Sequence, residues 1–285
     1  MRLHEIGQQL RAYRMESGMR AEEIAARLGV SRAALYRYEK GEVIKLDTVQ
    51  RLAELLRVSP LSLLGIGVEY YSRAVGFFER IRQIEETADQ ILQVADPLCF
   101  PVTSASYDFL LRDVLSHLAG EDTAPVDQLL SVLAARKRGY QARRPGIIAM
   151  MPEGALVRML EKGLFAGLPL DEPLRARCRA VAAQEAVQVA ELLEAEPMGL
   201  QFGLLVEQEP GTNCMLLRQR DRATLAINPF RTDSGVDGGG VALVTAAPEA
   251  VSTHQRVAEA MWRDSLKGPA AAARVRAVLA AHGAG

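Results

Sequence analysis

Cysteine is scarce in this chain of 285 residues. The three cysteines, Cys99, Cys178 and Cys214, lie far apart in the sequence and are odd in number. This pattern suits a reducing compartment and excludes a disulfide framework. No cysteine or histidine lies within four residues of another, so the ligand spacing of a zinc site is missing as well. We expect neither a metal nor any other cofactor.

Long apolar stretches are also missing. The sequence contains no run of about eighteen uncharged apolar residues, which is the length that a membrane-spanning helix needs. Residues 1–7 include Arg2, His4 and Glu5 and lack the apolar core of a secretory signal. We therefore expect a cytoplasmic protein without a membrane partner.

The common catalytic signatures do not occur either. There is no Gly-x-Ser-x-Gly elbow and no glycine-rich loop that ends in Gly-Lys-Ser or Gly-Lys-Thr. The glycine run at 238–240 is interpreted as the tip of a hairpin rather than as a phosphate-binding loop. These absences predict that the chain is not an enzyme. An enzyme with a regulatory head is the alternative.

The composition is that of a globular protein, with 49% apolar and 24% charged residues. The net charge of −1 excludes a uniformly basic coat for nucleic acid, but the charge is divided unevenly. Residues 1–65 hold 11 of the 34 basic and 8 of the 35 acidic residues, a net of +3, which leaves −4 for the remainder. A basic head on an acidic body is typical of DNA-binding proteins. We predict three parts: a head at 1–65, a linker at 66–96 and a larger domain at 97–285.

The head reads as a series of short helices. The first ends near Ser17 and has an apolar stripe formed by Leu3, Ile6, Leu10 and Tyr13. A second helix at 21–28 stops at Gly29, since glycine adopts the left-handed conformation at little cost. Ser31 is placed to cap a third helix at 32–40. Two further amphipathic segments follow at 46–56 and 61–64. Two helices joined by a tight turn with glycine are what a helix-turn-helix requires.

These segments resemble the phage repressor/Cro (Xre) family of helix-turn-helix regulators. The residues that carry the resemblance are Ile-Gly-Gln-Gln-Leu-Arg at 6–11, Glu-Glu-Ile-Ala-Ala-Arg-Leu-Gly-Val-Ser at 22–31, Tyr-Glu-Lys-Gly at 38–41 and the leucine-rich 52–64. The resemblance covers about 60 residues. It implies a five-helix domain that binds double-stranded DNA. A helical head that binds a protein partner, as in antitoxin-like proteins, is the alternative.

The third helix has an outward face that consists of Arg32, Ala33, Tyr36 and Arg37. By the resemblance, these positions reach base edges in the major groove. An arginine fork can bond O6 and N7 of guanine together. Arg37 could instead anchor a phosphate or remain a solvated charge, and Ala33 could touch a thymine methyl or only provide clearance.

Phosphate contacts are expected around the third helix. The resemblance assigns them to the region of the Ser31 cap, and Lys40 and Lys45 are candidates after the helix. Relatives often have serine or threonine followed by glutamine at the start of the second helix, where this chain has Arg20 and Ala21. Arg20 can supply a phosphate contact electrostatically, but the amide bridge of those relatives is missing. Glu39 is expected to form an ion pair within the head.

The segment 67–95 shows a helical apolar seam. Its members lie about 3.4 residues apart on average, which is close to a coiled-coil repeat: Val68, Tyr71, Val75, Phe78, Ile81, Ile84, Ala88, Ile91 and Ala95. We predict one long helix through which the chain dimerises. A long helix that lies on the core of its own larger domain is the alternative.

The larger domain mixes helical and strand-like segments. Helices are predicted at 105–119, 125–140, 153–165, 172–195, 248–266 and 269–281, and strands at 147–150, 200–207, 214–218, 223–228 and 240–246. This order predicts an α+β domain with a mostly antiparallel sheet. It bears a faint resemblance to the phospholipase-D-like sensory domains of some bacterial regulators. The His-x-Lys motif of that enzyme class is missing, so the implied role is sensory.

Two features of the larger domain could serve a ligand. Basic residues gather at Arg136, Lys137, Arg138, Arg143 and Arg144, either as an anion-binding patch or as a solvated helix end. Methionines could line an adaptable pocket or pack the core: Met150, Met151, Met159, Met198 and Met215. The sequence does not identify effector-binding residues. Together these observations predict a transcriptional repressor that binds an inverted-repeat operator as a homodimer and responds to a small molecule.

Overall fold

The computed structural model describes residues 3–94, 97–120, 122–230 and 240–283. Five helices form the head: α1 (Leu3–Ser17), α2 (Ala21–Leu28), α3 (Arg32–Glu39), α4 (Leu46–Leu56) and α5 (Pro60–Leu63). Gly29 ends α2 at φ 70°, and the Ser31 hydroxyl accepts a hydrogen bond from the amide of Ala34 at 3.1 Å. The predicted glycine stop and serine cap are therefore both confirmed.

The larger part of the molecule is built on one mixed sheet. We call this sheet and the helices that pack on it the body. The strands are β1 (Val68–Tyr71), β2 (Ala88–Val94), β3 (Gly146–Pro152), β4 (Leu200–Leu205), β5 (Cys214–Gln219), β6 (Ala223–Ile227) and β7 (Ala242–Thr245). In the described residues their order is β1-β7-β6-β5-β2-β3-β4. The β2–β3 and β3–β4 pairs are parallel and the others are antiparallel. The predicted α+β class is confirmed.

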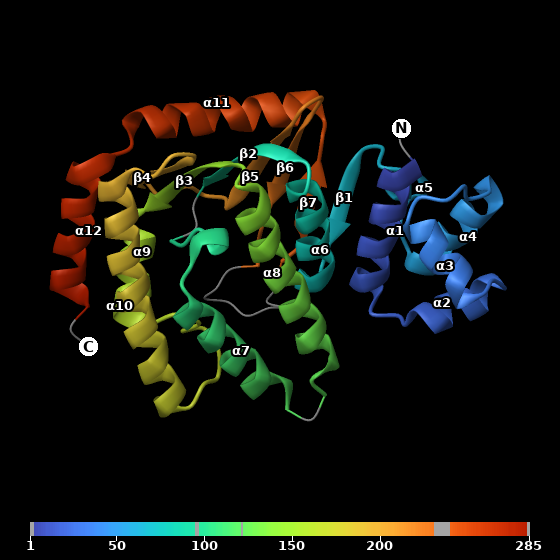
Figure 1. Ribbon diagram of the computed structural model, residues 1–285, viewed down its shortest axis with the longest axis horizontal. Helices are drawn as coiled ribbons and strands as arrows, with labels where there is room; N and C mark the ends of the chain where they lie inside the picture. Colours follow the sequence, from blue (N-terminus) through green and yellow to red (C-terminus); the bar gives the residue numbers. More distant parts are fainter. Residues whose placement is uncertain (1–2, 95–96, 121, 231–239, 284–285) are drawn as a thin grey trace.

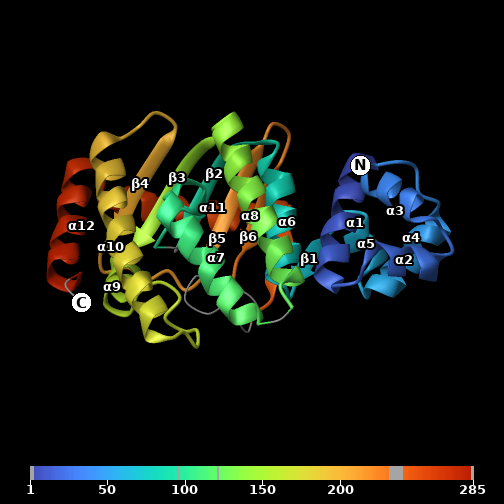
Figure 2. The same cartoon turned by 60° about the horizontal axis from the view of Figure 1, so that its bottom comes forward.

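Helices cover both faces of this sheet (Figure 1). One face carries α6 (Ala74–Glu85), α7 (Ala105–Ala119), α8 (Ala124–Arg143) and α10 (Glu172–Ala195), with the short η1 (Phe100–Val102) beneath them. The opposite face carries α11 (Pro248–Asp264), while α9 (Glu153–Lys162) and α12 (Gly268–His282) pack beside α10 at the β4 end (Figure 2). Strand side chains alternate between the layers. Met215 and Leu217 lie in the larger core, whereas Leu216 belongs to the smaller cluster beneath α11.

The predicted linker helix at 67–95 is wrong. That segment forms β1, α6 and β2, and both strands belong to the sheet of the body. Strand residues such as Tyr71 and Ile91 are buried by two-residue alternation, whereas Val75 and Ile81 are buried by helical spacing. The strand spacing of β1 and β2 and the helical spacing of α6 together give an average spacing of apolar residues that is close to a coiled-coil repeat. Most seam residues that the structure describes are buried inside their own chain, so they do not offer a dimer surface, while Ala95 lies outside the described residues.

The remaining sequence predictions agree closely with the fold. α7 and α10 have the predicted bounds, and the other elements differ by a few residues at their ends. The predicted glycine-rich hairpin tip falls mostly on 231–239, which lie outside the described residues. Within the described part of the chain, no helix combines the length and apolarity needed to cross a membrane.

Candidate nucleic-acid interface

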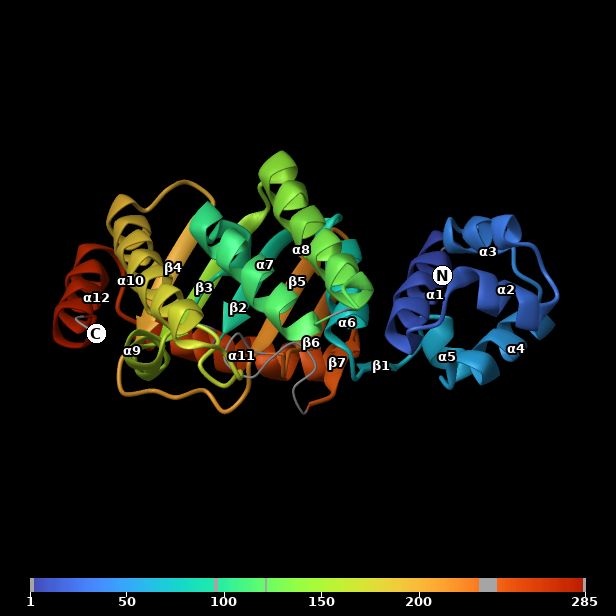
Figure 3. The same cartoon turned by 90° about the horizontal axis from the view of Figure 1, so that it is seen from below.

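The third helix of the head has one buried face and one exposed face. Leu35 is fully buried, and Ala34 and Glu39 are also enclosed. Arg32, Ala33 and Arg37 are exposed. Viewed from below, α3 lies along an outer edge of the head (Figure 3). The exposed arginines are therefore accessible to a macromolecule, as the sequence predicted.

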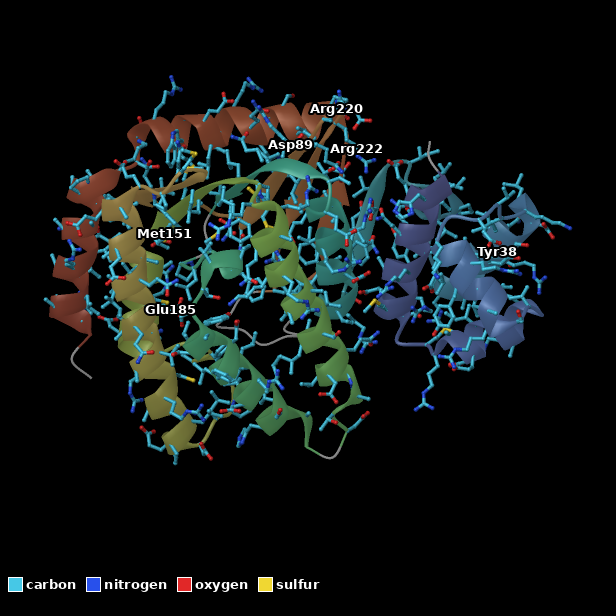
Figure 4. All side chains as sticks on the ribbon, viewed as in Figure 1. Tyr38, Asp89, Met151, Glu185, Arg220 and Arg222 are labelled. Atoms are coloured by element: carbon cyan, nitrogen blue, oxygen red, sulfur yellow. The ribbon has the colours of Figure 1, made fainter. Side chains whose placement is uncertain are left out.

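A buried ion pair fixes α3 on α1. Arg14 Nε donates to Glu39 Oε1 at 2.5 Å and Arg14 Nη2 donates to Glu39 Oε2 at 3.2 Å. Close backbone packing supports this pair, since a Cβ at Gly7 would lie 2.5 Å from the carbonyl oxygen of Tyr38. Tyr38 itself lies between α3 and the head core (Figure 4). The structural role expected for Glu39 is confirmed.

The turn before α3 is held by a residue that the sequence analysis missed. Arg51 on α4 donates from Nη2 to the carbonyl oxygens of Leu28 at 3.0 Å and Arg27 at 3.4 Å. These carbonyls end α2 and have no partner within the helix. Arg51 therefore positions the turn. The sequence does indicate that the last carbonyl oxygens of every helix need hydrogen-bond donors. It does not indicate which side chain supplies them.

Arg32 and Arg37 already have acidic neighbours. Arg32 Nη1 lies 2.6 Å from Glu22 Oε1, and Arg32 Nη2 donates to the Tyr36 hydroxyl at 3.1 Å. The guanidinium also stacks 5.3 Å from the centre of the Tyr36 ring. The bond to Tyr36, followed by the Glu22 charge, raises the pKa of Arg32. Arg37 Nε lies 3.5 Å from Glu42 Oε2.

The other predicted contact residues lie at the ends of neighbouring elements. Arg20 immediately precedes α2 and Lys45 immediately precedes α4, while Lys40 follows α3, and all three side chains are exposed. Ser31 is exposed as well, although its hydroxyl is engaged as the α3 cap. Arg20 and the half-buried Tyr36 line a groove of about 380 Å³ between the head and the N-terminal end of α8. Tyr36 is thus half-buried at this groove and is not part of the fully exposed face of α3.

The head is joined to the body through α1. The Glu69 carboxylate on β1 accepts hydrogen bonds from Gln9 at 2.7 Å, from the Tyr71 hydroxyl at 2.7 Å and from Arg80 at 2.8 and 2.9 Å. The rings of Tyr13 and Tyr71 stack with their centres 5.3 Å apart. Arg222, near the top of Figure 4, lies 3.5 Å from Glu5. The contact is both polar and aromatic, and it fixes the orientation of the head.

Glu16 provides a second connection between the two parts. Its Oε1 accepts hydrogen bonds from the Ser72 amide at 2.6 Å and the Ser72 hydroxyl at 2.7 Å, and its Oε2 accepts one from the Arg73 amide at 3.0 Å. A residue of α1 therefore holds the turn immediately before α6. The two helices approach closely at Gly76, where an added Cβ would lie 2.8 Å from the Glu16 Cβ.

Of the two interpretations of the basic residues at 136–144, a single anion-binding patch is wrong. Arg136 and Lys137 are buried, because Arg136 pairs with Glu85 at 2.6 Å and Lys137 pairs with Asp108 at 2.5 Å. Arg138, Arg143 and Arg144 remain exposed at the C-terminal end of α8. Sequence spacing could not separate the buried pair from the exposed cations. Both groups lie on one helix, and their acidic partners come from other segments.

The cysteines and most of the methionines are core residues. Cys99, Cys178 and Cys214 are all buried. Burial raises the pKa of Cys214 to about 11, and it also raises that of Cys178. Among the methionines considered as pocket residues, Met150, Met151, Met159 and Met215 are buried, whereas Met198 is fully exposed. No cluster of three potential metal ligands occurs among the residues that the structure describes.

Comparisons with known proteins identify the head. Residues 5–64 match the family model of the helix-turn-helix domain, which assigns α1–α5 to that class. No curated protein matches the chain. One similar solved structure is TrmBL2, described as an archaeal chromatin protein with a novel mode of DNA binding. It is 10% identical, and the match covers 78% of this chain and 61% of TrmBL2 with a TM-score of 0.33. That score is too low to establish a common fold for the body.

Proposed function

We propose that this protein is a DNA-binding transcriptional regulator with an Xre-type head, and that α3 enters the major groove. One observation carries the proposal: Arg32, Ala33 and Arg37 are exposed on a helix whose opposite face is locked to α1 by Arg14 and Glu39. A rigid helix that presents guanidinium groups fits base-edge recognition. Arg20, Ser31, Lys40 and Lys45 surround it as phosphate contacts.

In this proposal the protein is a repressor that acts in the cytoplasm. It has no catalytic activity. A single head neutralises few phosphates, so specific binding calls for two half-sites about one helical turn apart and thus for a homodimer. The operator is then an inverted repeat. A small-molecule effector that binds the body would change the spacing of the two heads by favouring one arrangement.

The proposal is tested by the affinity of the full chain for duplex genomic fragments at several salt concentrations. Replacement of both α3 arginines, Arg32→Ala with Arg37→Ala, is expected to weaken binding at least about tenfold, because each arginine–guanine contact contributes about 1–3 kcal/mol. The variant should also lose specificity at the contacted base pairs, whereas the salt dependence, which the phosphate contacts set, should change little.

A matched control removes the same charge elsewhere. Arg256 and Arg263 are exposed on α11, across the sheet from α6 to α8. Their joint replacement by alanine should leave the affinity nearly unchanged. Equal affinities of the α3 variant and the wild-type chain for every fragment would refute a role of α3 in DNA binding.

A second function has one supporting observation. Apolar side chains on and after the head are exposed, at 74% for Val43, 77% for Leu46, 56% for Leu61 and 50% for Ile66. Such residues are typical of a protein-binding surface. An antitoxin-like head would co-purify with a stoichiometric protein partner and give no footprint on DNA. The exposed arginines of α3 favour the DNA-binding function.

A further inference from the structure

The body contains a partly open cavity between its helices and its sheet. The cavity has a volume of about 100 Å³, and α6, α7, α8, β2 and β5 all contribute to its lining. Figure 3 shows α7 and α8 in front of these strands. Most of the lining is apolar, and it includes Phe78, Tyr107, Leu111, Leu133 and Phe230. Its volume is of the same order as that of an apolar cavity of roughly 150 Å³ that binds benzene in another protein.

The charges at the cavity are already neutralised. Arg136 is the cation of the lining, and its Nε and Nη2 donate to the Glu85 carboxylate at 2.9 and 2.6 Å. The guanidinium also lies between two aromatic rings, 5.2 Å from the centre of Phe78 and 5.1 Å from that of Phe100. An anionic ligand would have to displace Glu85 from a buried pair, which is costly. The site therefore selects against anionic ligands.

The polar side chains of the lining are few and are held in place. Gln93 Nε2 donates to the carbonyl oxygen of Leu98 at 3.0 Å, and Asn228 Oδ1 accepts from the amide of Phe230 at 2.9 Å. The Thr103 hydroxyl donates to the carbonyl oxygen of Phe100 at 3.0 Å. These contacts fix the walls. A few fixed polar groups in an apolar lining are usual for small-molecule sites.

The helix α6 connects this cavity with the head. Phe78 lines the cavity, whereas Gly76 lies against Glu16 of α1. Glu79 pairs with Arg11 of α1 at 2.9 Å, and Gln83 donates to the carbonyl oxygen of Gln8 at 2.9 Å. These contacts form a continuous connection from α6 to α1, and from α1 to α3 through Arg14 and Glu39. One helix thus contacts both the ligand space and the DNA-binding head.

We propose that this cavity binds a neutral, mainly apolar molecule about the size of benzene, and that α6 transmits its binding to the head. The regulatory part of this proposal rests on the proposed function as a DNA-binding regulator. The binding part does not depend on it. The two parts are therefore tested separately.

Ligand binding is measured on the full chain without DNA. Fluorobenzene is the probe, and its ¹⁹F signal should broaden on addition of the protein and recover on competition with benzene. The charged analogue 4-fluorobenzoate should give no such effect. A fluorobenzene signal that the folded wild-type protein leaves unchanged would overturn the binding proposal, as would equal broadening of 4-fluorobenzoate.

Cavity-filling variants locate the site. Leu133→Phe and Leu129→Phe both add volume at the lining, and each should weaken fluorobenzene binding at least about tenfold. Leu160→Phe is the matched control, because Leu160 is buried in α9 but does not line the cavity. Wild-type affinity in both folded cavity variants would place the probe elsewhere and overturn the assignment. If one variant fails to fold, the other still decides.

Transmission is measured as the affinity for duplex DNA with and without saturating fluorobenzene. A change of threefold or more is expected for the wild type and none for Leu133→Phe. An unchanged DNA affinity at saturation would overturn the α6 route but not the binding. Failure of the wild type to bind any duplex would overturn the proposed function and, with it, the regulatory role of the cavity, while the ¹⁹F result would stand on its own.

Discussion

Arg32 shows how a side chain that points toward solvent can still be restrained. Glu22 and Tyr36 hold its guanidinium, and both contacts must loosen or rearrange when a base edge becomes the partner. Both partners of the ion pair are more than half exposed, at 59% for Arg32 and 55% for Glu22. Water screens an exposed pair of this kind, so it contributes little to stability. The restraint is therefore weak enough for DNA to replace it.

Removal of the Glu22 charge is expected to strengthen DNA binding. Glu22→Gln frees Arg32 and removes an anion close to the approaching phosphates, so the affinity should rise about twofold to fivefold at low salt. Titration of a labelled duplex with the full chain measures the effect. Glu249→Gln, on α11 of the body, removes the same charge and should change nothing. A weaker affinity for Glu22→Gln would indicate that Glu22 positions Arg32 for recognition.

At the scale of elements, local signals predicted most of the fold. The bounds of α7 and α10 follow from their serine and aspartate caps and from a single helical period. The segment 67–95 was wrongly predicted as one long helix. The reason is that β1, α6 and β2 are short and their apolar residues happen to lie at spacings that fit a single helix. The turn between β1 and α6 is held by Glu16, a residue more than 50 positions away. No local pattern contains that information.

The candidate site was predictable to a similar extent. The exposure of Arg32, Ala33 and Arg37 follows from the helical period of α3, which buries Leu35. The position of Tyr36 beside α8 and the contact of Arg51 with the end of α2 depend on how separate elements pack. Sequence periodicity determines the faces of one helix, but not which neighbour covers each face.

Two glycines in helices provide a paired test of the α1–α6 packing. A Cβ at Gly76 would meet Glu16 at 2.6–3.0 Å, whereas one at Gly139 would meet nothing within 4 Å. Gly76→Ala should therefore lower the free energy of unfolding by about 1–3 kcal/mol through overpacking. Gly139→Ala should raise it by about 0.5–1 kcal/mol, because alanine favours the helix. Urea unfolding measures both, and destabilisation of similar size in both variants would contradict the close approach at Gly76.

At the scale of the whole molecule, the three thiols report on global unfolding. All three are buried, and the raised pKa of Cys214, about 11, leaves little thiolate at pH 8. Ellman's reagent at pH 8 should therefore react slowly with the native chain and rapidly with all three cysteines in urea. The stabilised Gly139→Ala variant should slow the native reaction further. Fast labelling of one thiol in the native protein would instead reveal a reactive cysteine.

The helix α1 belongs to the packing of both the head and the body, which limits how such proteins can recombine during evolution. Tyr13, Gln9 and Glu16 complete the body as much as the head. Exchange of the first 65 residues between related genes would therefore join surfaces that had not evolved together. A viable recombinant would need crossover points that keep α1 and α6 from the same parent, so these two helices should be inherited as one unit.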